Sequence, residues 1–129
     1  MATSTAIASL ETLVVIHRSN NLDEIYTQLI SNFKRVPHFD WIGIYIQDEE
    51  GMSLKAASDE IPSVSLARLS ILQIPIRADK NDLGKITVMT RPTQAIDESD
   101  YLALMKTGDE LGKKIALLDR SASTDQQGI

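Results

Sequence analysis

Cysteine is absent from this sequence of 129 residues. Without thiols the chain cannot form disulfide bonds, bind a metal through thiolates, carry out thiol redox catalysis or hold a chromophore by a thioether link. We therefore expect no redox centre of that kind, and nothing else in the sequence indicates a cofactor.

Positive charge and aromatic residues are both scarce. The chain has 13 lysines and arginines against 18 aspartates and glutamates, a net charge of −5, and only 5% aromatic residues. The longest basic runs are "KR" at 34–35 and "KK" at 113–114. Because a surface with this balance repels polyanions, we expect neither nucleic acid nor an anionic membrane as a partner.

Long apolar runs are also missing. No stretch reaches the roughly 18 apolar residues of a membrane-spanning helix. The first residues lack the positive charges of a signal peptide, and Glu11 and Thr12 interrupt their apolar pattern. We expect a cytoplasmic protein, and its length and 43% hydrophobic content suit one globular domain. We place this domain at 1–118 and expect a disordered tail at 119–129.

Three segments have the spacing of amphipathic helices. The first covers about 5–18, where Ile7, Leu10, Val14 and His17 recur every three or four residues. The second covers 22–36, follows the same rule almost without error, and has Asn21 as a plausible N-cap. The last begins after Asp97 or Ser99 and continues to about 118.

The stretch "FDWIGIYIQDEEGMSLKAASD" at 39–59 predicts two strands joined by a turn. In the first strand, isoleucines at 42, 44 and 46 share one side, while Trp41, Gly43 and Tyr45 share the other. Both faces of the sheet should therefore be covered. A second hairpin is predicted from "SILQIPIR" at 70–77 and "KITVMT" at 85–90, with Pro75 marking an edge strand or a bulge.

The order helix, helix, hairpin, connection, hairpin, helix predicts the fold class. Sequential hairpins form an antiparallel sheet, and the helices must pack on it. We therefore expect an α+β domain with flanking N-terminal and C-terminal helices. The connection at 59–69 has mixed signals and room for one helical turn after Pro62.

Three segments in this order resemble GAF domains. They are "NLDEIYTQLISNFKRV" followed by "FDWIGIYI", then "LQIPIRADKNDLGKITVMT", and finally "AIDESDYLALMKTGDELGKKI". The first strand is most similar to the branch that contains the free methionine-(R)-sulfoxide reductases. The resemblance implies a GAF-like sheet and a role in signalling.

The sequence also departs from that family. A typical GAF domain has dozens of residues between its second strand and its late hairpin, and here only "DEIPSVSLARL" stands there. The reductase branch uses cysteines, and bilin attachment needs one. We therefore expect neither sulfoxide reduction nor bilin binding, nor cyclic-nucleotide binding, and we predict that the chain is not an enzyme.

Trp41, Gly43 and Tyr45 are the candidate ligand-binding residues, since the glycine leaves a concave spot between two rings. In GAF domains that this stretch resembles, the same face looks into the ligand pocket. The alternative is that both rings simply pack in the core. No charged groups converge on the strand, so a small neutral ligand is expected.

The remaining polar residues indicate no metal site. His17 and His38 are the only histidines, and the sequence offers no third ligand at a suitable spacing. The acidic residues 97, 98 and 100 suit the start of a helix. "DKNDLG" at 79–84 has only the beginning of a calcium loop.

Gly108 and Gly112 lie one turn apart on the last helix, where glycine costs about 0.5–1 kcal/mol relative to alanine. Close approach of another backbone would compensate, either from this chain's own sheet and first helix or from a second chain. The resemblance implies a homodimer through the first and last helices. The predicted interface comprises Ile7, Leu10, Val14, Gly108, Leu111, Gly112 and Ile115.

Two functions remain in view. One is a non-catalytic regulatory or interaction module, a homodimer with a protein partner in a regulatory system. The other is a small-molecule sensor with a reduced pocket on the Trp41 and Tyr45 face.

Overall fold

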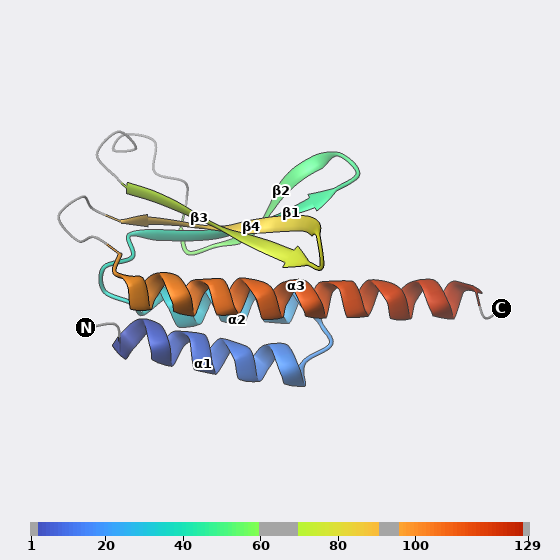
Figure 1. The fold of residues 1–129 in the computed structure, drawn as a ribbon, viewed down its shortest axis with the longest axis horizontal. Helices are drawn as coiled ribbons and strands as arrows, with labels where there is room; N and C mark the ends of the chain where they lie inside the picture. The colour runs from blue at the N-terminus through green and yellow to red at the C-terminus, as the bar shows by residue number, and fades with distance from the viewer. Residues whose placement is uncertain (1–2, 60–69, 91–95, 128–129) are drawn as a thin grey trace.

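The computed structural model describes residues 3–59, 70–90 and 96–127. In chain order, the helices and strands are α1 (Thr3–Arg18), α2 (Leu22–Lys34), β1 (Trp41–Asp48), β2 (Gly51–Ala57), β3 (Ser70–Ala78), β4 (Asn81–Thr90) and α3 (Glu98–Gln127) (Figure 1). The predicted α+β class is confirmed. The helical turn expected after Pro62 lies outside the described residues.

The strands form one antiparallel sheet in the order β2-β1-β4-β3. Each hairpin reverses in a tight turn, with Gly51 at a φ of 118° in one and Asp79 at a φ of 57° in the other. The first value suits glycine, which has no Cβ to clash with its own backbone. Pro75 lies on β3, an edge strand of the sheet, as predicted.

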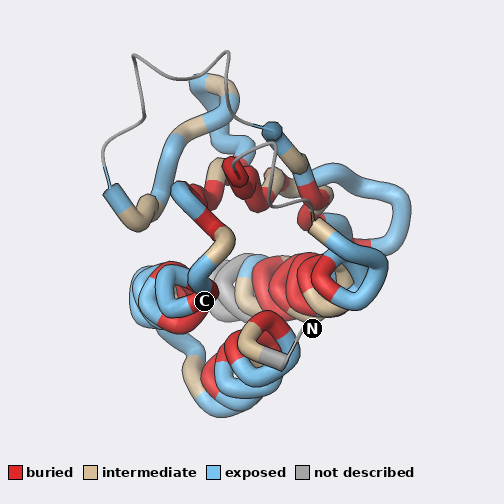
Figure 2. Tube along the Cα trace, turned by 90° about the vertical axis from the view of Figure 1, so that its left-hand side faces the viewer, coloured by how far each residue is buried: buried red, intermediate tan, exposed pale blue. Residues whose placement is uncertain are grey.

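All three helices lie on one side of the sheet (Figure 1). α2 and α3 pack directly against strands, while α1 packs on α2 and α3 as a further layer. Figure 2 shows the buried residues gathered between the helices and the sheet. This arrangement leaves the opposite face of the sheet, which carries Trp41, without a helix among the described residues.

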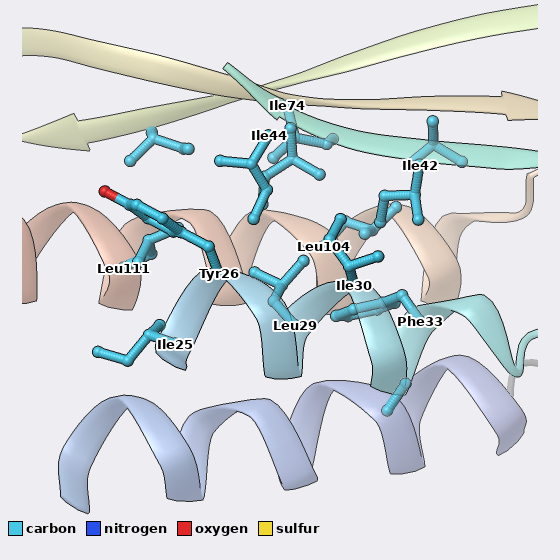
Figure 3. Close-up of a cluster of buried hydrophobic side chains, with 14 of the residues drawn as sticks. Ile25, Tyr26, Leu29, Ile30, Phe33, Ile42, Ile44, Ile74, Leu104 and Leu111 are labelled. Carbon is cyan, nitrogen blue, oxygen red and sulfur yellow. The ribbon is translucent and has the colours of Figure 1, made fainter. Parts of the chain in front are cut away.

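The core fills the space between the sheet and the helices. Ile42, Ile44 and Ile74 descend from the strands toward Leu29 of α2 and Leu104 of α3 (Figure 3). Each such aliphatic side chain contributes about 1.5–3 kcal/mol when fully buried. The predicted alternation of β1 is therefore present in the structure, because its isoleucines at even positions all face the helices and belong to the core.

α3 approaches β3 closely at its two glycines. A Cβ added at Gly108 would lie 2.6 Å from the carbonyl oxygen of Pro75, and one added at Gly112 would overlap the carbonyl of Arg77. Of the two packings that the sequence allowed for these glycines, the structure has the one against the chain's own sheet. Neither glycine is therefore open to a second chain.

α3 is also longer than the sequence predicted. The pattern ended near 118, and 119–129 was expected to be a disordered tail. The structure instead continues the helix to Gln127, and Figure 1 shows its last turns extending beyond the sheet. No helix in the described ranges is both long and apolar enough to cross a bilayer.

Candidate functional site

The face of the sheet away from the helices carries the predicted ligand residues. Strand pairing sets them beside a row on β4, with Trp41 opposite Met89, Gly43 opposite Thr87, and Tyr45 opposite Lys85. We call these six residues the outer face. It contains one aromatic side chain at each end of the β1 row and a small residue between them.

Trp41 lies across Gly43. A Cβ added at Gly43 would overlap the indole ring, and Trp41 is almost completely buried. Its Nε1 donates a hydrogen bond to the carbonyl oxygen of Asp59 at 2.9 Å. The concave spot that the sequence suggested beside Gly43 is thus occupied by the ring of Trp41 itself. Ligand contact by these residues stays a prediction.

The ring of Tyr45 lies beside the charged side chain of Lys85. The Nζ of Lys85 lies 5.4 Å from the centroid of the Tyr45 ring, within the range of a cation–π interaction. Both side chains are half-buried. The sequence revealed no charged group on this face because the pairing of β1 with a strand forty residues away cannot be read from either strand alone. The outer face therefore offers a positive charge as well as aromatic surface.

Thr87 is a polar residue that sequence reasoning missed. It is buried at the centre of the outer face, and its Oγ1 has no hydrogen-bond partner among the described residues. A buried hydroxyl usually finds a partner, because leaving it unpaired costs free energy. The alternation of "KITVMT" could have placed Thr87 on the other face of the strand from Ile86. Nothing in the sequence shows that the hydroxyl of Thr87 lacks a partner.

His38 takes part in a polar cluster at the start of α3. Its Nε2 lies 2.9 Å from Oδ2 of Asp100, which is itself buried in the first turn of α3. Asp97 and Asp100 cap this helix reciprocally, since Oδ1 of Asp97 accepts from the Asp100 amide at 2.8 Å and Oδ2 of Asp100 accepts from the Asp97 amide at 3.3 Å. The cluster therefore ties the loop before β1 to the start of α3.

Burial of Asp100 opposes its ionisation. The neighbouring hydroxyl of Thr5, the hydrogen bond with His38 and the Asp97 amide outweigh that effect, so the pKa of Asp100 is lowered below its ordinary value. His17, the other histidine, lies on the exposed side of α1, with Nε2 3.7 Å from Oε2 of Glu110. Within the described ranges, no three His, Asp or Glu side chains gather in a way that could hold a metal.

The predicted interface residues fall into two groups. Leu111 and Ile115 of α3 are buried in the chain's own core, as the two glycines are against β3. Ile7, Leu10 and Val14 of α1 are 52%, 64% and 57% exposed. The interface as a whole stays a prediction, and only its α1 members are available to another chain.

α1 has apolar residues on both of its sides. Ile7, Leu10 and Val14 form a stripe that faces outward, while the inner side buries Ala8, Val15 and Ile16 together with the polar residues Thr5, Ser9 and Thr12. Oγ of Ser9 lies 2.9 Å from Oγ1 of Thr107, and Thr12 accepts a hydrogen bond from the Asn32 side chain at 3.1 Å. Hydrogen bonds and the buried side chains of Val15 and Ile16 thus hold α1 to the other helices, while the stripe on its outer side remains at the surface.

No protein-family model matches the chain, and no curated protein matches it. Several solved structures, in contrast, are similar to the chain. The GAF domain of a phosphoenolpyruvate-protein phosphotransferase from Coxiella burnetii is similar with a TM-score of 0.72 and 11% identity, over 95% of this chain and 98% of that chain. Residues 122 to 287 of a methyl-accepting chemotaxis protein are similar with a TM-score of 0.63 and 12% identity, over 84% of this chain and 96% of that chain.

A third similar structure is an enzyme. Free methionine-R-sulfoxide reductase from Neisseria meningitidis, solved in complex with its substrate, has a TM-score of 0.69 and 13% identity, over 89% of each chain. Together these matches show that the chain has the GAF fold. At such identities they show the fold alone.

The reductase match also requires a correction. The absence of cysteine and of an evident catalytic group led us to predict that the chain is not an enzyme, but free methionine-R-sulfoxide reductases have the same fold, so that prediction is wrong. The similarity is distant, and it assigns no reaction to this chain.

Proposed function

We propose that this GAF-fold chain is a regulatory or sensor module that acts as a homodimer in a cytoplasmic signalling system. The matches to a GAF domain of a phosphotransferase and to a chemotaxis protein support the regulatory role. The exposed stripe on α1, formed by Ile7, Leu10 and Val14, carries the proposal of a dimer.

The stripe favours protein contact because it is a second apolar side on a helix whose inner side is already packed. A surface helix usually buries its large aliphatic residues and exposes its polar ones. α1 buries Val15 and Ile16 in this way, but it also leaves the three aliphatic side chains of the stripe more than half exposed. Exposing the stripe costs solvation free energy, which burial against a partner recovers.

A second copy of the chain fits the stripe well. Ile7 and Val14 are nearly symmetric about Leu10, and the stripe is about 10 Å long at 1.5 Å per residue. An antiparallel pair of α1 helices related by a two-fold axis therefore sets Ile7 against the partner's Val14 and the two Leu10 side chains against each other. Such an interface is self-complementary, as a two-fold dimer requires.

Sedimentation velocity over a concentration series tests the dimer. The native chain should sediment as a dimer, and Leu10→Lys should shift it to monomer, because a charge at the centre of the stripe loses its hydration in the interface. Met52→Lys is the matched control, since Met52 is 46% exposed on β2 and should leave the dimer intact. A Leu10→Lys chain that remains dimeric contradicts the proposal.

A small-molecule sensor is the second candidate, and the unpaired hydroxyl of Thr87 favours it. A ligand that reached the outer face would give this buried group a hydrogen-bond partner and find aromatic surface at Tyr45. We expect a small ligand with an apolar body and one polar group.

Native mass spectrometry of gently purified protein tests the sensor candidate. A retained small mass should be present in the native chain and reduced in Thr87→Val, which keeps the shape of the side chain but removes the hydroxyl. Thr27→Val, at an exposed position on α2, is the control and should retain the mass. Native protein without any added mass argues against the sensor.

A further inference from the structure

A hollow lies where the start of β3, the end of β4 and the first turns of α3 meet. It has a volume of about 390 Å³, within the lower range of small-molecule sites. Its lining comprises Ser70, Ile71, Leu72, Thr90, Ile96, Asp97, Glu98 and Tyr101. None of these residues is among the six of the outer face, although Ile71 pairs with Met89 and therefore lies on that side of the edge strand.

Apolar side chains make up much of the lining. Ile71 is 50% exposed and Tyr101 is 41% exposed, although both are large, and Leu72 and Ile96 are half-buried beside them. Leu72 lies on the same side of the sheet as Thr90, and burying the exposed parts of Leu72 and Tyr101 against a ligand is favourable at about 25 cal/mol per Å². The hollow therefore suits a ligand with an apolar body.

Thr90 supplies a polar group that needs a partner. It is 1% exposed, and its Oγ1 forms no hydrogen bond with any described residue. The residue lies at the end of β4, on the same side of the sheet as the core residues Ile86 and Val88. Since an unpaired buried hydroxyl is costly, a ligand atom that donates or accepts a hydrogen bond here is stabilised.

The charges in the lining have one sign. Asp97 and Glu98 contribute carboxylates, and no lysine, arginine or histidine is among the described lining residues. Asp97 already caps the Asp100 amide through Oδ1, whereas Glu98 is exposed at the rim. This potential favours a positive ligand and opposes an anion.

We propose that the hollow binds a small organic cation, an amine with an apolar body. The ammonium group donates to Oγ1 of Thr90 and interacts with the carboxylate of Glu98. The apolar body covers Leu72, Ile96 and the ring of Tyr101.

Phenethylamine is the probe, and phenethyl alcohol is its neutral counterpart of nearly the same shape. Protein-observed NMR titration of the native chain should show saturable binding of the amine, with shifts centred on Leu72, Thr90 and Tyr101. The alcohol should bind about threefold to fivefold more weakly, because it lacks the charge. Equal affinity for the two probes, shifts centred on the outer face, or no saturable binding of the amine would each overturn the proposal.

Two substitutions separate the contribution of the Glu98 charge from that of the Thr90 hydrogen bond. Glu98→Gln should bring the affinity for the amine close to that for the alcohol, and Glu49→Gln, in the exposed turn between β1 and β2, should leave it unchanged. Thr90→Val should weaken both probes by about threefold to tenfold through the lost hydrogen bond. If Thr90→Val fails to fold, the Glu98→Gln comparison decides alone, because Glu98 is at the surface; undiminished preference for the amine in Glu98→Gln contradicts the proposal.

Discussion

At the scale of single residues, Gly43 shows most clearly how one position constrains its neighbour. The indole of Trp41 occupies the space that a side chain at this position would need. We predict that Gly43→Ala lowers the free energy of unfolding by about 1–3 kcal/mol, because the added methyl group must displace a buried ring.

Urea denaturation followed by circular dichroism measures the effect of Gly43→Ala. Ser31→Ala, at an exposed position on α2, serves as the control and should change stability by less than about 0.5 kcal/mol. An unchanged midpoint for Gly43→Ala would show that the Trp41 ring moves away at no cost.

Asp100 links stability to pH. Its pKa is lowered in the folded chain from an ordinary value of 3.8, so its ionised form stabilises the fold at every pH above that value. This contribution is lost as the pH falls below 3.8 and through the lower pKa of the folded state. We therefore predict that the free energy of unfolding decreases in this acidic window.

Asp100→Asn tests the assignment. At neutral pH it should destabilise the fold by about 1–3 kcal/mol, because the buried partners of the carboxylate lose a charged acceptor. It should also flatten the acid dependence, which thermal unfolding at a series of pH values measures. Glu49→Gln should leave the acid dependence as it is in the native chain, and an equally steep dependence in Asp100→Asn would assign it to other carboxylates.

At the scale of secondary-structure elements, α3 and β3 are fitted to each other through backbone contact. Alanine favours a helix over glycine by about 1 kcal/mol, so Gly112→Ala would stabilise an isolated helix. In this fold the added Cβ overlaps the Arg77 carbonyl, which belongs to the backbone and cannot swing away. We predict that Gly112→Ala is destabilising overall by at least about 1 kcal/mol.

Chemical denaturation compares Gly112→Ala with Asp109→Ala, an exposed position on the same helix. Asp109→Ala should be close to neutral. A gain in stability for Gly112→Ala would mean that α3 packs less closely on β3 than the structure has it.

α1 shows where sequence patterns stop being informative. The three-and-four spacing of Ile7, Leu10 and Val14 predicted the helix correctly. A pattern of this kind does not say which side of a helix faces inward when both sides carry apolar residues, and in α1 Val15 and Ile16 lie on the buried side. Thr5, Ser9 and Thr12 pack inward because they find hydrogen bonds or close contact there, and such partners lie far away in the sequence.

At the scale of the whole molecule, the order of elements was predictable because each has a local signal. The turns at Gly51 and Asp79 and the alternation of β1 were enough to indicate two hairpins and an antiparallel sheet. The pairing of β1 with β4 could not be predicted from the sequence. The contacts of Tyr45 with Lys85 and of Gly43 with Thr87 depend on that pairing, so they could not be predicted either. The candidate site is thus less predictable than the fold, since its residues come from strands that only the tertiary structure brings together.

The packing of α3 likewise could be predicted only in part from the sequence. The two glycines indicated a close approach of another backbone, but only the structure identifies that backbone as β3. A charge at Ile115, or bulk at Gly108, would therefore damage the core of the monomer rather than divide a dimer. The α1 stripe is the part of the predicted interface on which a dimer can be tested.

The most direct measurement uses the absence of native cysteine. Leu10→Cys introduces a single thiol at the centre of the stripe, where a two-fold axis would bring two copies together. Mild oxidation at micromolar concentration should convert most of this variant to a disulfide-linked dimer on a non-reducing gel, while Met52→Cys, on β2, should remain largely monomeric on the same gel. If Leu10→Cys forms no more cross-linked dimer than Met52→Cys, the two-fold α1 dimer is contradicted.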